Sequence, residues 1–365
     1  MEEMQSRIRK VLIVHSPHSG RASELGQALT DLQQEGISIA ETLAISDLDG
    51  LPAQGNRWAA SGIDIIVAAG GDGLVGGVIT HIAESDLLLG ILPLGTANDI
   101  ARSLNIPQDV RRAAETIAHG QPKAIDVGVA HPAEQTPHPS ASSQGNPPHT
   151  YTSPQTHGYF AHALTVGLNV QFARLATSIA TRQRYGGLTY PLAALEVLKN
   201  RTVLDVELRF EGLAMPPNMS AEQQTMSAKE ISSLRCRALQ VAAINAPIFG
   251  GAWQLTIPGA SLQDHLLDIL VIEDLDREAL STAITRFFRQ QEQQPSDLAL
   301  WRARYPLLHT ADLTGIPGIH HIRARGVIIS TTNDPQDATL DGEIRGQTPI
   351  YAHMAKKRLQ VIAPQ

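Results

Sequence analysis

The chain has 365 residues and a formal net charge of −7 at pH 7, from 29 Lys and Arg against 36 Asp and Glu. At about 150 residues per domain the length predicts two domains, and a composition of 42% hydrophobic and 18% charged residues excludes a mostly disordered chain. The acidic balance disfavours nucleic acid as a partner, because affinity for phosphate backbones comes from clustered Lys and Arg.

The N-terminal segment carries no recognisable targeting signal. Its apolar run, residues 11–14, is too short for a signal-peptide core, and no stretch approaches the roughly 20 apolar residues that span a bilayer. The single cysteine, Cys236, needs no oxidising compartment. We therefore expect a cytoplasmic protein without a transmembrane segment.

The first third alternates strand-like and helix-like patterns. Strands are expected over residues 11–14, 63–69 and 87–93, with a helix over 22–35 and helical stretches after the second and third strands. This order predicts an α/β, Rossmann-like domain with a parallel sheet. In such sheets ligands bind beyond the carboxyl ends of the strands, where the glycine-rich turns of this chain fall.

Residues 131–158 differ from both flanks. They contain six prolines and four histidines but no Val, Ile, Leu, Met, Phe, Lys or Arg, so they cannot add to a core. We interpret them as a disordered loop inserted between two strands. Metal binding by the histidines is the alternative, and their irregular spacing makes it the weaker one.

From residue 159 onward strand patterns dominate, at 160–166, 203–210, 237–244, 267–272 and 326–330. They predict a mostly antiparallel second domain, with a hairpin over 215–233, a helical insertion over 277–304 and a last strand at 359–362. We divide the chain into an α/β domain at 1–126, a β-rich domain at 127–332 and a C-terminal segment at 333–365.

The motif most informative about function is the turn from Ala69 to Gly77. Its Gly71, Gly73 and Gly76 match the dinucleotide-binding fingerprint, but Asp72 would place a carboxylate where a pyrophosphate must approach. A carboxylate beside phosphates is better explained by a divalent cation between them. The alternative without function is a tight turn with Asp72 as a helix cap.

A second polar turn, residues 93–99, follows the next strand and offers Thr96, Asn98 and Asp99. Taken alone it is an ordinary helix N-cap. Two acid-bearing turns at neighbouring strand ends nevertheless indicate a shared site, and Asp126 could add a third carboxylate at the domain junction.

These motifs resemble the diacylglycerol kinase superfamily, which includes bacterial lipid kinases and sphingosine kinases. The resemblance covers nearly the whole chain. It rests on GGDG at 70–73, on PLGTANDIARSLNIP from residue 93, and on four shorter matches: the Ser16–Gly20 turn, Asn245 with Gly250 and Gly251, Asp264 to Asp268, and the Asp341-Gly342-Glu343 turn.

The resemblance implies an ATP- and Mg²⁺-dependent lipid kinase whose site lies between the α/β domain and a β-sandwich-like second domain. By position it assigns nucleotide binding to Ser16, Pro17, His18, Ser19, Gly20, Thr42, Gly70, Gly71, Asp72, Gly73, Gly76, Thr96, Asn98 and Asp99. It implies catalysis by Asp341 with Glu343 and Asp72, and catalytic Mg²⁺ held through water by Asp72, Asp99 and Asp126. A structural Mg²⁺ would be held by Asp264 with backbone carbonyls near Ser261 and Leu266.

The chain departs from the family pattern at several positions. Leu74 stands where Thr is usual after GGDG, and Gly76-Gly77 where Asn-Glu follows. In the second domain His162 replaces a common Asn, Asn169 a common Asp, and His265 a common Gly. The carboxylates that the kinase chemistry needs are all present.

The sequence is compatible with three functions. The favoured one is a lipid kinase whose substrate is diacylglycerol-like or sphingoid-like, and which works transiently at the inner face of the membrane. The second is a non-catalytic nucleotide- or lipid-binding relative with an eroded phosphate turn, and the third an NAD-binding enzyme. The lipid and the oligomeric state are left open, a homodimer being one alternative.

Overall fold

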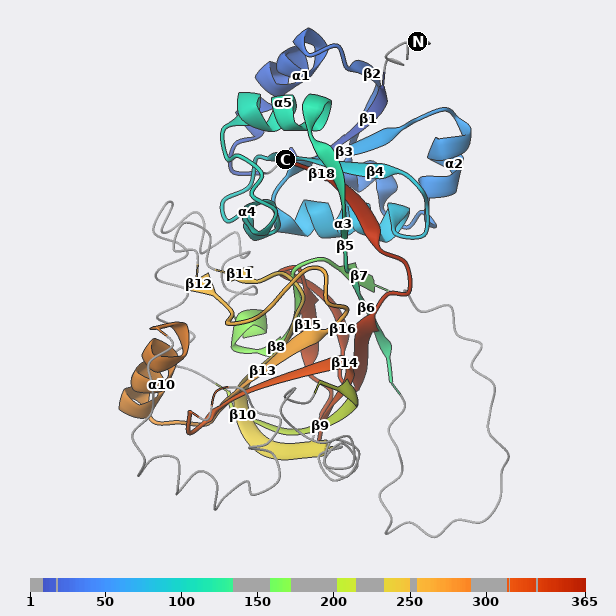
Figure 1. Cartoon of the computed structure of the whole chain (residues 1–365). Helices are drawn as coiled ribbons and strands as arrows, with labels where there is room; N and C mark the ends of the chain where they lie inside the picture. The colour runs from blue at the N-terminus through green and yellow to red at the C-terminus, as the bar shows by residue number, and fades with distance from the viewer. Residues whose placement is uncertain are drawn as a thin grey trace, which may run out of the picture.

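The computed structural model describes residues 9–17, 19–133, 158–171, 202–214, 233–249, 255–289, 314, 316–332 and 334–365. These residues form two halves, each built on one large sheet (Figure 1). The first sheet has six strands and the second has ten. No helix of the described residues is long and apolar enough to cross a membrane.

The first sheet has the order β2-β1-β3-β4-β18-β5. Its strands are β1 (Lys10–His15), β2 (Ser38–Ala44), β3 (Ile65–Gly70), β4 (Leu88–Pro93), β5 (Gln121–Ile125) and β18 (Leu359–Ala363). Every residue of β3 is buried, as expected for a central parallel strand covered on both faces. The predicted parallel α/β sheet is confirmed, with β1, β2, β3 and β4 all parallel.

Short and medium helices connect these strands. They are the 3-10 helices η1 (Ala22–Glu24) and η2 (Ile45–Leu48) and the α-helices α1 (Leu25–Gln34), α2 (Gly55–Ala60), α3 (Asp72–Ile82), α4 (Asp99–Ser103) and α5 (Val110–His119). Helix α3 lies on the side of the first sheet that faces the second half (Figure 1) and contacts β7 there.

The chain crosses between the two halves twice. It leaves the first sheet after β5, at Asp126, and returns to it at β18. Strand β18 lies between β4 and β5, with Val361 opposite Leu89 in parallel pairing and Leu359 opposite Ile125 in antiparallel pairing. A strand from the far end of the sequence thus completes the first sheet.

The second sheet is antiparallel in all its described pairings, which confirms the predicted β-rich second half. Its strands are β6 (Gly128–Pro132), β7 (Gly158–Phe160), β8 (Ala163–Gly167), β9 (Leu204–Leu213), β10 (Ser233–Ile244), β13 (Leu267–Glu273), β14 (Ile319–Thr331), β15 (Asp337–Leu340), β16 (Glu343–Gln347) and β17 (Ile350–Met354). Strand β9 pairs with both β10 and β14, so the sheet closes back on itself. The remaining elements are the small pair β11 (Ile248–Phe249) and β12 (Leu255–Thr256) and the helix α10 (Arg277–Arg289).

Strand β14 begins at Ile319, seven residues before the predicted start. Its first residues include two adjacent histidines, and because these are polar the sequence lacks the apolar pattern that predicts a strand there. His320 and His321 are both almost fully buried and pair with acids of β13: His320 with Glu273 at 3.0 Å and His321 with Asp268 at 2.7 Å. Burial with a partner lets polar residues occupy core positions.

The predicted insertion at 131–158 is flanked by paired strands, since Ala130 of β6 lies opposite Gly158 of β7. Strand β6 continues through Pro132, because His131 and Pro132 pair with β17. Residues 134–157 lie outside the described residues. So do 215–232 of the predicted hairpin, and 290–304 of the predicted helical insertion, whose first part is α10.

Candidate active site

Three turns meet at the carboxyl edge of the first sheet, after β1, β3 and β4. A Cβ added to Gly95 would lie 2.3 Å from the Cα of Gly71, so the turns after β3 and β4 are in direct backbone contact. A Cβ on Gly20 would lie 3.1 Å from Oγ1 of Thr96, which brings the turn after β1 to the same place. Only glycine, which has no Cβ, fits where two backbones approach this closely.

Asn98 organises the turn after β4. It adopts a left-handed conformation with φ of 53°, which Asn tolerates better than most residues. Its Oδ1 accepts from Gly95 N at 3.0 Å, and its Nδ2 donates to Pro93 O at 3.2 Å and to Gln108 Oε1 at 3.0 Å. The side-chain hydrogen bonds of Asn98 therefore stabilise the conformation of the turn.

The turn after β1 presents a polar atom that needs a partner. Ser19 Oγ is buried and forms no hydrogen bond within the described residues. A buried unpartnered hydroxyl is costly unless a ligand or water satisfies it. Pro17 and Gly20 of this turn are exposed, and His18 lies outside the described residues. The turn is thus able to take a polar ligand such as phosphate.

Asp72 connects two of the turns. Its Oδ1 accepts the backbone N–H of Ile100 at 2.9 Å, near the start of α4, where Asp99 is the first residue and only 5% exposed. Oδ2 of Asp72 accepts no hydrogen bond from the described residues. A carboxylate oxygen beside a glycine turn is a hard ligand of the kind Mg²⁺ prefers, so Asp72 fits a hydrated magnesium ion, and the metal role of Asp99 stays a prediction. Thr42 is exposed on the edge strand β2, opposite Ile13.

The second half contributes the Asp341-Gly342-Glu343 turn between β15 and β16. Asp341 has φ of 49° and is 7% exposed. Three consecutive backbone N–H groups donate to its carboxylate: Ala161 at 2.9 Å to Oδ2, His162 at 2.9 Å and Ala163 at 3.0 Å to Oδ1. These donors fix the carboxylate in one orientation.

Burial raises the pKa of Asp341 to about 6, although the charge of His162 and the three backbone donors lower it. Desolvation disfavours the ionised form of a carboxyl group, and hydrogen bonds to the ionised form favour it. A carboxyl group with a pKa of about 6 is mostly ionised at neutral pH and still basic enough to take a proton.

The turn that carries Asp341 lies directly on helix α3. A Cβ on Gly76 would be 2.4 Å from Oδ2 of Asp341, and a Cβ on Gly73 would be 2.8 Å from Oε1 of Glu343. Glu343 also forms an ion pair with Arg345 at 2.5 Å. Gly73 and Gly76 of α3 therefore lie in direct contact with the Asp341–Glu343 turn.

His162 holds the segment that binds Asp341. Its Nε2 lies 2.9 Å from the carbonyl of Ile248, which can only accept, so this nitrogen carries hydrogen. The ring also packs on Phe249 with centroids 4.1 Å apart. Asn245 supports the same segment by donating from Nδ2 to Ala161 O and Asp126 O, each at 2.8 Å.

The predicted metal residues of the junction have other partners. Both carboxylate oxygens of Asp126 are engaged, by Arg358 Nε at 2.7 Å and by the backbone N–H of His265 at 2.6 Å. Asp264 is paired with Arg323 and accepts from Leu266 N at 3.1 Å. Ser261 Oγ accepts from Gln263 N at 3.2 Å. The carboxylates of Asp126 and Asp264 therefore do not fit a magnesium ion as they stand. The roles predicted for the backbone carbonyls near Ser261 and Leu266, and for Asp126 at the catalytic metal, stay predictions.

Sequence reasoning missed the residues that act through the backbone or through charge. The Ala161–Ala163 donors carry no side-chain signal and are distant in sequence from Asp341. Arg21 donates to Gln108 O at 3.1 Å and to Pro93 O, bracing the turn after β4. Arg358 belongs to a run of basic residues, a pattern typical of solvent-exposed surface. The glycine motifs and the positions of basic residues in the sequence therefore could not identify these contacts.

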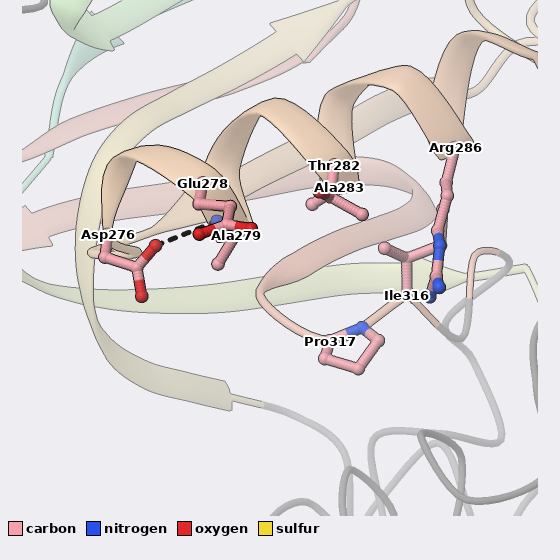
Figure 2. Close-up of a pocket in the computed structure, with 8 residues that line it drawn as sticks. All are labelled: Asp276, Glu278, Ala279, Thr282, Ala283, Arg286, Ile316 and Pro317. Carbon is pink, nitrogen blue, oxygen red and sulfur yellow. Dashed lines mark hydrogen bonds between the residues drawn. The ribbon is translucent and has the colours of Figure 1, made fainter.

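A cavity of about 400 Å³ lies elsewhere, between α10 and the turn at Ile316 and Pro317 (Figure 2). Asp276 lines it and caps α10 by accepting from Ala279 N at 2.8 Å. It shares no residue with the site described above.

Comparisons with known proteins identify the family of the chain. Residues 10–130 match the family model described as the diacylglycerol kinase catalytic domain. Residues 163–313 match the model described as the YegS C-terminal NAD kinase beta sandwich-like domain. Together the two models span both halves of the fold.

Two curated relatives, both named diacylglycerol kinase, come from Staphylococcus aureus strains bovine RF122 / ET3-1 and MRSA252. Each is 21% identical over 361 residues, which covers 98% of this chain and 93% of the relative. A crystal structure described as a diacylglycerol kinase from Bacillus anthracis str. Sterne superposes with a TM-score of 0.62 at 18% identity, covering 98% of each chain. The chain therefore belongs to the diacylglycerol kinase catalytic-domain superfamily, and at the level of that family it is a lipid kinase, a phosphotransferase with an alcohol group as acceptor.

Proposed function

We propose that this chain transfers the γ-phosphate of ATP to the hydroxyl group of a diacylglycerol-like or sphingoid-like lipid. The observation that carries the proposal is the carboxylate of Asp341, held by three backbone N–H groups directly over Gly76 of α3. A carboxylate beside the helix that follows the glycine turn, with its pKa raised to about 6 by burial, supports the role of Asp341 as the base.

The nucleotide phosphates would lie at the three turns. Backbone N–H groups at the start of α3 favour negative charge, because the helix dipole places partial positive charge there. Ser19 Oγ, which has no hydrogen-bond partner among the described residues, would supply a further donor. The proposed phosphate-lining residues are Ser16, Pro17, His18, Ser19, Gly20, Gly70, Gly71, Gly73, Gly76 and Thr96, and Thr42 would lie toward the nucleoside.

Asp341 would accept the proton of the lipid hydroxyl as its oxygen attacks the γ-phosphorus. The bond from the γ-phosphorus to the bridging oxygen breaks, and ADP leaves with that electron pair. Glu343, beside Gly73, would orient the acceptor. Asp72 and Asp99 would hold Mg²⁺, which when bound neutralises charge on the phosphates; phosphoryl transfer depends largely on such positioning and neutralisation.

The test is transfer of γ-³²P from ATP, with Mg²⁺, into the organic-extractable fraction of a bacterial lipid extract. Wild type should label a lipid, and Asp341→Asn should lower the rate by about 10²- to 10⁴-fold, the usual contribution of a general base. Asp72→Asn should also lose activity. Glu115→Gln, which removes an exposed carboxylate on α5, is the matched control and should keep it.

Chromatography of the labelled product identifies the acceptor class. ATP binding without label in any lipid would overturn the proposal in favour of a non-catalytic relative. Binding of NAD(H) in preference to ATP would favour the dinucleotide alternative. Equal turnover by Asp341→Asn with an unchanged fold would remove Asp341 from the role of base.

We further propose that the chain acts transiently at the inner face of the membrane, where such lipids reside. With a net charge of −7, contact must be local, and the Arg111-Arg112 pair on α5 is one candidate. Sedimentation with vesicles of anionic phospholipid, with and without diacylglycerol, tests this. Equal absence from both vesicle pellets would contradict it.

A further inference from the structure

The loop at residues 261–266, which leads into β13, is held by two arginines. Arg358 lies just before β18, where its Nη2 donates to the loop carbonyl of Gln263 at 2.8 Å and its Nε binds Oδ1 of Asp126, outside the loop, at 2.7 Å. The same Asp126 accepts from the backbone N–H of His265 at 2.6 Å. One guanidinium group thus binds a carboxylate and a main-chain carbonyl together.

Arg323 holds the loop from the other side. Its Nη2 pairs with Asp264 Oδ2, and its Nε lies 3.4 Å from Oδ1 of Asp268. Asp268 is fully buried and also contacts Nε2 of His321 at 2.7 Å. The Arg323 side chain is 23% exposed and that of Asp264 is 26% exposed, so this pair is partly shielded from water.

These arginines bind the kinds of oxygen atom that a magnesium ion would need as ligands. Mg²⁺ binds carboxylate and carbonyl oxygens and demands near-octahedral geometry. Here the Asp264 carboxylate, the Asp126 carboxylate and one loop carbonyl already face guanidinium groups. A divalent cation placed among them would meet two positive charges at close range.

The contacts of Arg358 lie where the chain passes between the two halves. Asp126 follows β5 where the chain leaves the first sheet, and Arg358 precedes β18 where it returns. The Asp126–Arg358 pair therefore ties the two crossings together, and the Gln263 carbonyl ties both to the second half.

We propose that Arg323 and Arg358 take the place of a structural divalent cation at the 261–266 loop, so that the junction between the two halves is held by internal ion pairs. The proposal concerns the fold and does not depend on the proposed phosphate transfer. Guanidinium groups suit this role because they stay charged and bind planar oxygen pairs.

The experiment uses the full chain without nucleotide and measures the thermal unfolding midpoint in EDTA and in MgCl₂, together with metal content by mass spectrometry. Wild type is expected to hold less than one divalent cation per chain after dialysis. Its midpoint should be the same in both solutions. Asp72→Asn, run in parallel, removes magnesium bound at the glycine turn, so a metal effect that persists in this variant belongs to the junction.

Arg323→Gln releases the Asp264 carboxylate and is the decisive variant. Its midpoint should fall by several degrees in EDTA, and MgCl₂ should recover part of the loss, because a cation can then replace the missing charge. Arg358→Gln should also lower the midpoint. Arg111→Gln removes an exposed arginine that pairs, among the described residues, with Glu115 on its own helix, and it should change neither value.

Two results would overturn the proposal. One is a wild-type midpoint that falls in EDTA, recovers in MgCl₂ and does so equally in Asp72→Asn. The other is an Arg323→Gln midpoint equal to that of wild type. Should Arg323→Gln fail to fold, the wild-type and Asp72→Asn measurements still decide the question.

Discussion

Asp341 combines a buried position with three backbone donors, and the balance of the two sets its proton affinity. Burial raises the pKa to about 6. The proposed base works only when ionised, so kcat/KM should be constant above this pKa and fall about tenfold per pH unit below it. A pH profile of lipid phosphorylation checks this. A profile flat down to pH 4 would show that the rate does not depend on a group of this pKa.

His162 provides a test of the same balance, because its charge lowers the pKa of Asp341. In His162→Asn the backbone N–H to Asp341 is kept while the charge is lost. The acid limb of the pH profile should move to higher pH, with little change in the plateau rate. A profile superimposable on that of wild type would mean that the imidazole serves only to hold Ile248 and Phe249.

At the scale of elements, α3 is fitted to the turn that carries Asp341. In Gly76→Ala the new methyl group would lie 2.4 Å from Oδ2 of Asp341, and this oxygen cannot move freely because Ala161 N holds it. We expect kcat to fall by about 10²-fold, the usual cost of misplacing a catalytic group by about 1 Å.

The matched control is Gly77→Ala on the same helix. Its new methyl group would meet Cδ1 of Ile45 at 3.2 Å, the end of a side chain that can shift. Both substitutions replace Gly by Ala inside a helix, which favours helix formation by up to about 1 kcal/mol. Circular dichroism melting should therefore show folded proteins in both cases, with activity lost only in Gly76→Ala. Equal activity of the two would contradict the close fit.

The sequence predicted the elements that have periodic apolar patterns and missed those whose polar residues find partners. Strands β1, β3 and β4 follow from uninterrupted apolar runs, and the glycine turns follow from their position after those strands. Strand β2 was missed because it is an exposed edge strand. The start of β14 was missed because His320 and His321 become buried only through pairing with β13. Similarly, no local pattern could show that residues 161–163 bind Asp341.

At the scale of the whole molecule, the first sheet depends on the C-terminal strand. Val361 and Ile362 of β18 are fully buried between β4 and β5. Ending the chain after Arg358 removes β18 and exposes an edge on each neighbour. We expect such a chain to lose cooperative unfolding or to aggregate, whereas ending it after Ala363 should leave the unfolding midpoint near that of wild type. Urea denaturation followed by circular dichroism distinguishes the two.

The return of β18 to the first sheet also constrains biosynthesis. Domains of many proteins fold during translation, the N-terminal one first. Here the three turns of the candidate site lie on a sheet that lacks an interior strand until residues 359–363 have left the ribosome. The nascent first half must therefore wait, with the β4 and β5 edges open, while the second half is made. A chain released early from a stalled ribosome would lack an interior strand of the sheet that carries the proposed nucleotide site.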